Sequence, residues 1–138
     1  MTEPVRFPTR IVLVLREDLE PWQVSNVSAF LASGIAAREL MGEPYADADG
    51  VEYLPLLGQP IIVLQGDRPT LGEVRRRAVE RELRVAVYDR GMFTTGDDAS
   101  NRQVVAASTG ADLDLVGVAV HGPKNAVDRI LKGIPRHR

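Results

Sequence analysis

The chain has 138 residues, of which 44% are apolar and 26% charged, and its formal net charge is −2. This length and balance predict a single globular domain with one buried core, and the small net charge argues against a global attraction to nucleic acid or anionic membranes. The sequence contains no cysteine and no apolar run of about 20 residues, so disulfides, thiolate metal sites and a membrane span are not expected. We therefore expect a cytoplasmic protein with no metal site and no cofactor.

Four short apolar runs predict the strands of a sheet. They are residues 10–15, 61–64, 85–88 and 115–120. Nearly continuous apolar runs of this length are typical of strands that are buried on both faces. Helical patterns separate the runs, which predicts a three-layer α/β/α domain around a mostly parallel sheet of four strands.

The first helix is predicted to follow Pro21, and Gly42 is its expected end. Many of its residues are small, so this helix is expected to approach a neighbouring element closely. Residues 44–55 come next, with Asp49 and Gly50 at their centre, and predict a peripheral β-hairpin with a tight turn.

The second helix is predicted to begin with a capping box formed by Thr70 and Glu73. Its arginines alternate with glutamates, which favours an ion-paired surface, so contact with tRNA is a weaker alternative. A short helix is expected near residues 98–107. The last helix is predicted to begin at residues 122–123, where proline is well tolerated, and to end at Gly133.

Three stretches resemble the type II peptidyl-tRNA hydrolases. Residues 13–19 (Leu-Val-Leu-Arg-Glu-Asp-Leu) resemble that family's opening strand and its Arg-x-Asp-Leu exit, residues 85–89 its third strand, and residues 116–123 its Gly-Pro turn. The resemblance covers roughly residues 10–133 and implies a peptidyl-tRNA hydrolase II-like fold with a mixed sheet. An uncharacterised bacterial branch of that superfamily is similar over two further stretches, residues 26–35 and 42–50.

The departures from the family pattern concern its catalytic side chains. Asn26, Phe30 and Ser33 stand where the hydrolases have Lys, Gln and His, whereas Asp89 and Thr94 are counterparts of the family's Asp and Thr. Loss of the lysine removes a cation that would hold phosphate or stabilise an oxyanion. We therefore expect little or no peptidyl-tRNA hydrolase activity.

Two classes of function remain open. The first is an enzyme, a hydrolase or transferase of an aminoacyl or related acyl substrate, with Asp89, Thr94 and His121 as its catalytic groups. The second is a non-catalytic binding protein that keeps the fold and the cleft. Each residue also has a structural alternative, since Asp89 could fix its loop, Thr94 could form a hydrogen-bonded turn and His121 could cap its turn.

For either function we expect a small polar ligand with an anionic or carbonyl group between the first helix start and the loop after the third strand. Its predicted binding residues are Asp18, Trp22, Asn26 and Thr95, and Trp22 and Phe93 are expected to form an apolar wall. Apolar residues outside the regular elements, with the family resemblance, also predict a homodimer. These residues are Trp22, Met92 and Phe93.

Overall fold

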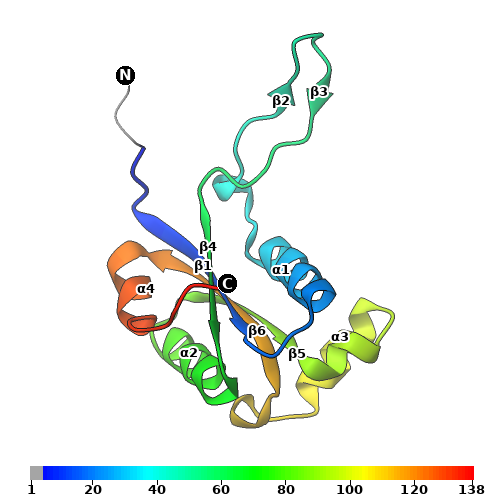
Figure 1. Ribbon diagram of the computed structural model, residues 1–138, viewed down its shortest axis with the longest axis vertical. Coiled ribbons are helices and arrows are strands. Elements are labelled where there is room, and N and C mark those ends of the chain that lie inside the picture. The colour runs from blue at the N-terminus through cyan, green and yellow to red at the C-terminus, as the bar shows by residue number, and fades with distance from the viewer. Residues whose placement is uncertain (1–4) are drawn as a thin grey trace.

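A sheet of four strands lies between helices on both of its faces, as Figure 1 shows. The computed structural model describes residues 5–138. The strands of the sheet are β1 (Thr9–Arg16), β4 (Ile61–Gly66), β5 (Arg84–Asp89) and β6 (Leu115–Pro123). The α-helices are α1 (Pro21–Ile35), α2 (Arg68–Glu80), α3 (Asp98–Ala106) and α4 (Lys124–Ile130). The short elements are η1 (Arg38–Leu40), η2 (Arg90–Thr94), η3 (Gly110–Asp112) and the two strands β2 (Tyr45–Ala46) and β3 (Glu52–Tyr53).

The strand order in the main sheet is β4-β1-β6-β5. Strand β1 pairs in parallel with β4 and antiparallel with β6, and β5 also pairs antiparallel with β6. Strands β1, β4 and β5 therefore run in one direction and β6 runs against them. The expected mixed sheet is confirmed, but it is not mostly parallel in its pairing, because β6 lies between β1 and β5 and leaves one parallel pair.

The alternation of side chains along β1 explains the three layers. Val12 and Val14 point to one face, where they pack with residues of α2 and α4, and Ile11, Leu13 and Leu15 point to the other, where they pack with α1. All five side chains are buried. The continuous apolar run therefore has the cause that the sequence suggested, burial of a strand on both faces.

Helix α1 packs closely on the sheet at Gly117 of β6. A Cβ atom on Gly117 would lie 2.6 Å from Cγ1 of Val27 and 2.7 Å from Cδ1 of Leu31, so a larger residue fits only if these side chains or the helix shift. On the helix side, a Cβ on Gly34 would lie 3.3 Å from Cβ of Ala86. The expected close approach of this small-residue helix is confirmed.

Two expected helix boundaries are wrong. Helix α1 ends at Ile35, and Gly42 is instead part of the hairpin, where its amide donates to the carbonyl oxygen of Leu56 at 2.8 Å. The residue that caps α2 is Asp67, whose carboxylate accepts from the amide of Thr70 at 2.9 Å and from its hydroxyl at 2.6 Å. Thr70 lies in the first turn of α2, where it donates hydrogen bonds to the capping residue and is not the cap itself.

The predicted peripheral hairpin is confirmed and forms an arm, here called the hairpin arm (residues 42–58), that projects from the body (Figure 1). Tyr45 and Tyr53 face each other across its two strands. At the tip, the amide of Gly50 donates to the carbonyl of Asp47 at 3.0 Å, and Gly50 has a φ of 85°, which glycine adopts without strain. The arm is a separate two-stranded sheet and is not continuous with the main sheet.

The outer edge of β4 is partly covered by the C-terminal segment. The amide of Gln65 donates to the carbonyl of Pro135 at 3.0 Å, and the amide of His137 donates to the carbonyl of Val63 at 2.9 Å. This segment thus occupies hydrogen-bonding groups that an edge strand would otherwise leave to solvent.

Candidate functional site

The direction of the strands decides which predicted site residues come together. The carboxyl ends of β1, β4 and β5 and the beginning of β6 lie at one edge of the sheet, here called the polar edge, because β6 runs against the other three strands. Asp18 and Asp89 lie at this edge. His121 lies near the opposite end of β6, where it pairs with Arg84 and Ile11 at the beginnings of their strands. The structure therefore does not bring His121 together with Asp89.

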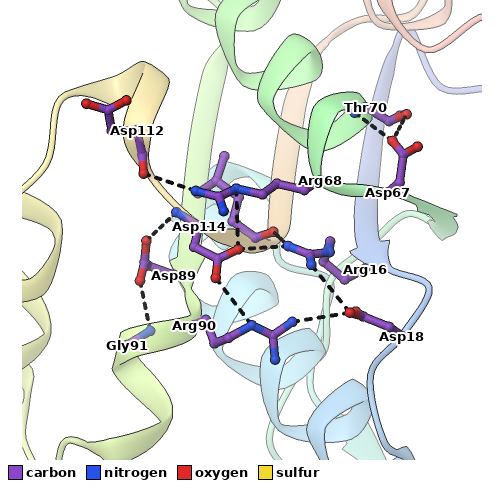
Figure 2. A network of polar contacts seen from close by, with 11 residues as sticks. Arg16, Asp18, Asp67, Arg68, Thr70, Asp89, Arg90, Gly91, Asp112 and Asp114 are labelled. Atoms are coloured by element: carbon purple, nitrogen blue, oxygen red, sulfur yellow. Dashed lines mark hydrogen bonds and ion pairs between the residues drawn. The ribbon is translucent and has the colours of Figure 1, made fainter.

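Asp89 is buried, with 8% of its surface exposed, and both of its carboxylate oxygens accept backbone hydrogen bonds. Oδ1 accepts from the amide of Gly91 at 2.8 Å, and Oδ2 accepts from the amide of Asp114 at 2.8 Å, as Figure 2 shows. These bonds join the loop after β5 to the beginning of β6. The geometry agrees with the structural alternative for Asp89, which is to fix its loop.

Asp18 belongs to a cluster of ion pairs beside Asp89, centred on Asp114 (Figure 2). Arg16, Arg68 and Arg90 approach the Asp114 carboxylate at 2.9, 3.6 and 3.4 Å. Asp18 pairs with Arg16 at 3.3 Å and with Arg90 at 3.5 Å. Burial raises the pKa of Asp114, but the hydrogen bond from Arg16 and the charges of the three arginines outweigh it and lower the pKa below its usual value. The cluster ties β1, α2 and η2 to β6.

A cleft of about 560 Å³ lies between α1 and the segment from Met92 to Asn101. Its wall includes Trp22, Asn26 and Thr95 among the residues predicted to bind a ligand. Asp18, Asp89, Thr94 and His121 are not among its lining residues within the described chain. The predicted site is thus split, with an open cleft on one side of α1 and a closed ion-pair cluster at the polar edge.

Four aromatic rings form a continuous wall of this cleft. Phe93 lies between Trp22 and Tyr88, with ring centres 5.6 and 5.2 Å away, and Tyr88 lies 6.0 Å from Phe30. Trp22 and Phe30 are 57% and 54% exposed, whereas Tyr88 is buried. The indole nitrogen of Trp22 donates to Glu20 at 2.8 Å, which orients the ring at the mouth. The expected apolar wall of Trp22 and Phe93 is present, and it is larger than expected.

Phe30 stands where the hydrolases that the sequence resembles have a glutamine. It neither enters the core nor closes the cleft, but stands half exposed on the wall beside Tyr88. A phenyl ring therefore replaces the hydrogen-bonding side chain that the hydrolase resemblance would place on this turn of α1.

Uncharged polar side chains line the cleft, among them those of Asn26, Tyr88 and Thr95. The side-chain amide of Asn26 donates to the hydroxyl of Tyr88 at 3.2 Å. Burial raises the pKa of Tyr88, against a smaller lowering by this hydrogen bond, so its hydroxyl keeps its proton. The hydroxyl of Thr95 contacts the carbonyl of Met92 at 2.9 Å and the side chain of Asn101. These groups can form directed hydrogen bonds with a ligand.

The charged side chains that line the cleft are acidic. Asp97 and Asp98 line it, and no Lys, Arg or His is among its lining residues in the part of the chain that the structure describes. Asp97 caps α3 and accepts from the amide of Ser100 at 2.7 Å and from its hydroxyl at 2.9 Å, which lowers the pKa of Asp97. Asp98 forms an ion pair with Arg102. An anionic ligand, the class expected from the sequence, therefore has no positive partner in this cleft.

The other predicted residues have local roles. The hydroxyl of Thr94 donates to the carbonyl of Gly91 at 3.0 Å, which closes the predicted turn. His121 lies 3.3 Å from a guanidinium nitrogen of Arg84, and burial and then this charge lower its pKa. On α2, Glu73 pairs with Arg76 and Arg77, which hold the pKa of Glu73 at about 2, so the expected ion-paired surface is present.

Sequence reasoning missed several residues of the cleft, among them Tyr88, Asp97 and Asn101. Tyr88 was assigned to a buried strand, and its position on the cleft depends on which face of β5 meets α1. Asp97 carried a signal, because an acidic residue three positions before Ser100 is typical of a helix cap. No sequence signal placed Asn101 beside Thr95.

The fold and the cleft define an α/β domain with a small-molecule-sized cleft beside its first helix. Its chain belongs to the DUF2000 family, described as "Protein of unknown function", whose model matches residues 9–138. A solved structure, the protein of unknown function Atu0240 from Agrobacterium tumefaciens strain C58, is 42% identical, covers 96% of this chain and 100% of its own, and has a TM-score of 0.92. Among curated proteins, no match was found.

None of the helices within residues 5–138 has the length and apolar character needed to cross a bilayer. Nor does this part of the chain hold three or more His, Asp or Glu side chains grouped as they would be around a metal ion.

Proposed function

We propose that this domain is a peptidyl-tRNA hydrolase II-like fold that has lost the hydrolase's chemistry and binds a small molecule in the cleft beside α1. The ligand we infer has an apolar or aromatic body and a neutral or positively charged polar group. The strand order, the mixed sheet and the matching motifs at residues 13–19, 85–89 and 116–123 support the fold assignment.

The aromatic wall, in a cleft whose charged lining residues are acidic, is the observation that carries the proposal. Apolar lining with a few directed polar groups is typical of small-molecule sites. Trp22 and Phe30 keep more than half of their surface exposed on that wall, where a ligand would cover them. Acidic Asp97 and Asp98 line the cleft and no basic residue of the described chain does, which favours an ammonium group over a carboxylate, and aromatic faces also attract a cation.

The positions of the predicted catalytic groups argue against hydrolysis. Both oxygens of Asp89 already accept amide hydrogens, and the hydroxyl of Thr94 donates within its own turn. His121 lies toward the other edge of the sheet. A general base must reach the proton that it removes, and none of these three groups lines the cleft as the structure describes it.

A second candidate is a hydrolase or transferase of an aminoacyl or related acyl substrate. The observation that favours it is the pairing of Asn26 with the protonated hydroxyl of Tyr88 inside the cleft. Such neutral donors can polarise a carbonyl group. This alternative predicts turnover of small aminoacyl esters that Tyr88→Phe abolishes, whereas the binding proposal predicts no turnover.

Ligand binding can be followed through Trp22, because the chain contains one tryptophan and it stands at the cleft mouth. We expect 2-phenylethylamine to quench its fluorescence saturably, and phenylacetate, matched in size but anionic, to bind at least tenfold more weakly. Phe30→Ala should weaken binding of the amine about tenfold, since it removes one wall of the cleft. Tyr45→Ala is the matched control, because Tyr45 is similarly exposed but lies on the hairpin arm.

Two results would contradict the proposal. Equal or tighter binding of phenylacetate would refute the inferred charge of the ligand, and absence of saturable binding by either compound, together with native mass spectrometry showing no co-purified small molecule, would refute the site. Peptidyl-tRNA cleavage at the rate of an authentic family member would refute the loss of hydrolase chemistry.

A further inference from the structure

The hairpin arm carries more exposed apolar surface than a solvated hairpin needs. Leu54 and Leu56 are 84% and 63% exposed, and Tyr45, Val51 and Tyr53 are about half exposed. Contiguous exposed apolar residues on a soluble domain mark a surface that meets a partner. This surface is separate from the cleft, and nothing inferred from it rests on the proposed ligand.

The arm is also acidic. Residues 42–58 contain Glu43, Asp47, Asp49 and Glu52 and no basic residue, so their formal charge is −4. A partner that binds the arm must therefore offer apolar contacts together with positive charge.

The same end of the molecule carries a groove with these properties. The N-terminal groove, about 700 Å³ in volume, lies beside the beginning of β4. Apolar side chains and three basic ones share its lining, among them Arg6, Phe7, Arg10, Pro60, Ile62 and Lys124. Arg10 pairs with Asp128 at 2.6 Å, whereas Arg6 and Lys124 take part in no ion pair within residues 5–138.

We propose that the hairpin arm of one copy of this chain binds in the N-terminal groove of a second copy, and that the second copy's arm binds in return. The two surfaces match in apolar character and are opposite in charge. Figure 1 shows the arm and the N-terminal segment projecting from the same end of the body, so one two-fold axis near that end brings both arms to both grooves.

The geometry of the arm's base supports this reciprocal exchange. The amide of Gly42 donates to Leu56 at 2.8 Å and the amide of Gly58 donates to Leu40 at 2.7 Å, which holds the arm away from its own body. A two-fold exchange forms the contact between arm and groove twice, once on each side of the axis. The two tyrosines of one arm alone offer on the order of 150–250 Å², since each is about half exposed, and the exposed Val51, Leu54 and Leu56 add to this apolar area on each arm.

The test is the oligomeric state by sedimentation equilibrium over a wide concentration range. We expect a dimer for the natural chain and at least a hundredfold rise in its dissociation constant for Leu54→Asp with Leu56→Asp. Val79→Asp is the control, because Val79 is 53% exposed on α2, away from the arm. A variant in which an Asn-Gly turn replaces residues 44–54 should be a monomer, because most of the arm is gone. It should still fold, because the hydrogen bonds at the arm's base remain.

Charge exchange tests the choice of groove. Arg6→Glu with Lys124→Glu should weaken the dimer, Glu43→Lys with Glu52→Lys should do the same, and the four changes together should restore it. A natural chain that stays monomeric at high concentration would overturn the proposal, as would a dimer that survives loss of the arm. A dimer that needs the arm but is indifferent to Arg6 and Lys124 would overturn the groove as the binding site.

Discussion

Replacing Asp89 with asparagine separates a structural role of this residue from a role in binding. Asp89 accepts two amide hydrogens, from Gly91 and Asp114, both at 2.8 Å and at a buried position. Asparagine has one carbonyl oxygen, so one of these bonds persists and the other becomes a contact between two donors. A hydrogen bond to a charged group contributes about 1.5–3 kcal/mol, and leaving an amide unsatisfied costs about 1–3 kcal/mol more.

We therefore expect Asp89→Asn to lower the free energy of unfolding by about 3–5 kcal/mol, which for a domain of this size shifts Tm by roughly 10–20 °C. Denaturant titration with far-ultraviolet circular dichroism measures the loss. Asp97→Asn is the matched control, since Asp97 caps α3 at an exposed position where asparagine caps equally well. Its unfolding free energy should change by about 0.5 kcal/mol or less. Unchanged stability of Asp89→Asn combined with lost binding of 2-phenylethylamine would refute this reasoning.

Two further predictions concern packing and pH. Gly117→Ala should lower the unfolding free energy by about 2–3 kcal/mol, measured by the same titration, because its methyl group would overlap Val27 and Leu31; a loss below about 0.5 kcal/mol would show that α1 can move. His121, which faces Arg84 and Glu39, has a pKa lowered from 6.5, first by burial and then by Arg84. The stability that depends on neutral His121 is complete above pH 6.5 and is lost as the pH falls through the lowered pKa of the folded state. Thermal melts from pH 7 to pH 5 should therefore show a smaller decline in Tm for His121→Gln than for the natural chain. Equal declines would contradict this assignment.

The strands could be predicted from the sequence because each is a short segment whose apolar residues indicate its burial. Residues 10–15 are apolar at every position but the first, which a strand covered on both faces requires. The direction of β6 is not recorded in that way. An apolar run has the same composition whichever way it crosses the sheet, and this is why His121 was grouped with Asp89 although the structure separates them.

The helix boundaries show a second limit. Gly42 is of a residue type that often ends a helix, but it lies in the arm, where its amide donates to the carbonyl of Leu56. Thr70 is of a residue type that often caps the start of a helix, but Asp67, three positions earlier, caps α2 instead. Several residues in each stretch fit the local rule, and contacts with distant residues choose among them.

The cleft was predicted in part. Trp22, Asn26 and Thr95 line it as expected, because the beginning of α1 and the loop after β5 face each other. Asp18 was expected there because it precedes the first helix, and Thr94 because of the family resemblance, but Asp18 is held by arginines and Thr94 by its own turn. Ion pairing at the polar edge thus engages Asp18 and a local turn engages Thr94, and neither contact is visible in the sequence.

The C-terminal segment has a consequence for the handling of this protein. Its bonds to Val63 and Gln65 cover only part of β4, and Ile61 remains 37% exposed at the uncovered beginning of the strand. An edge strand with free amides and carbonyls is a template for intermolecular β-pairing and hence for aggregation. Shortening the chain before Pro135 would extend that template along β4, so we expect such a truncation to aggregate more readily than the natural chain.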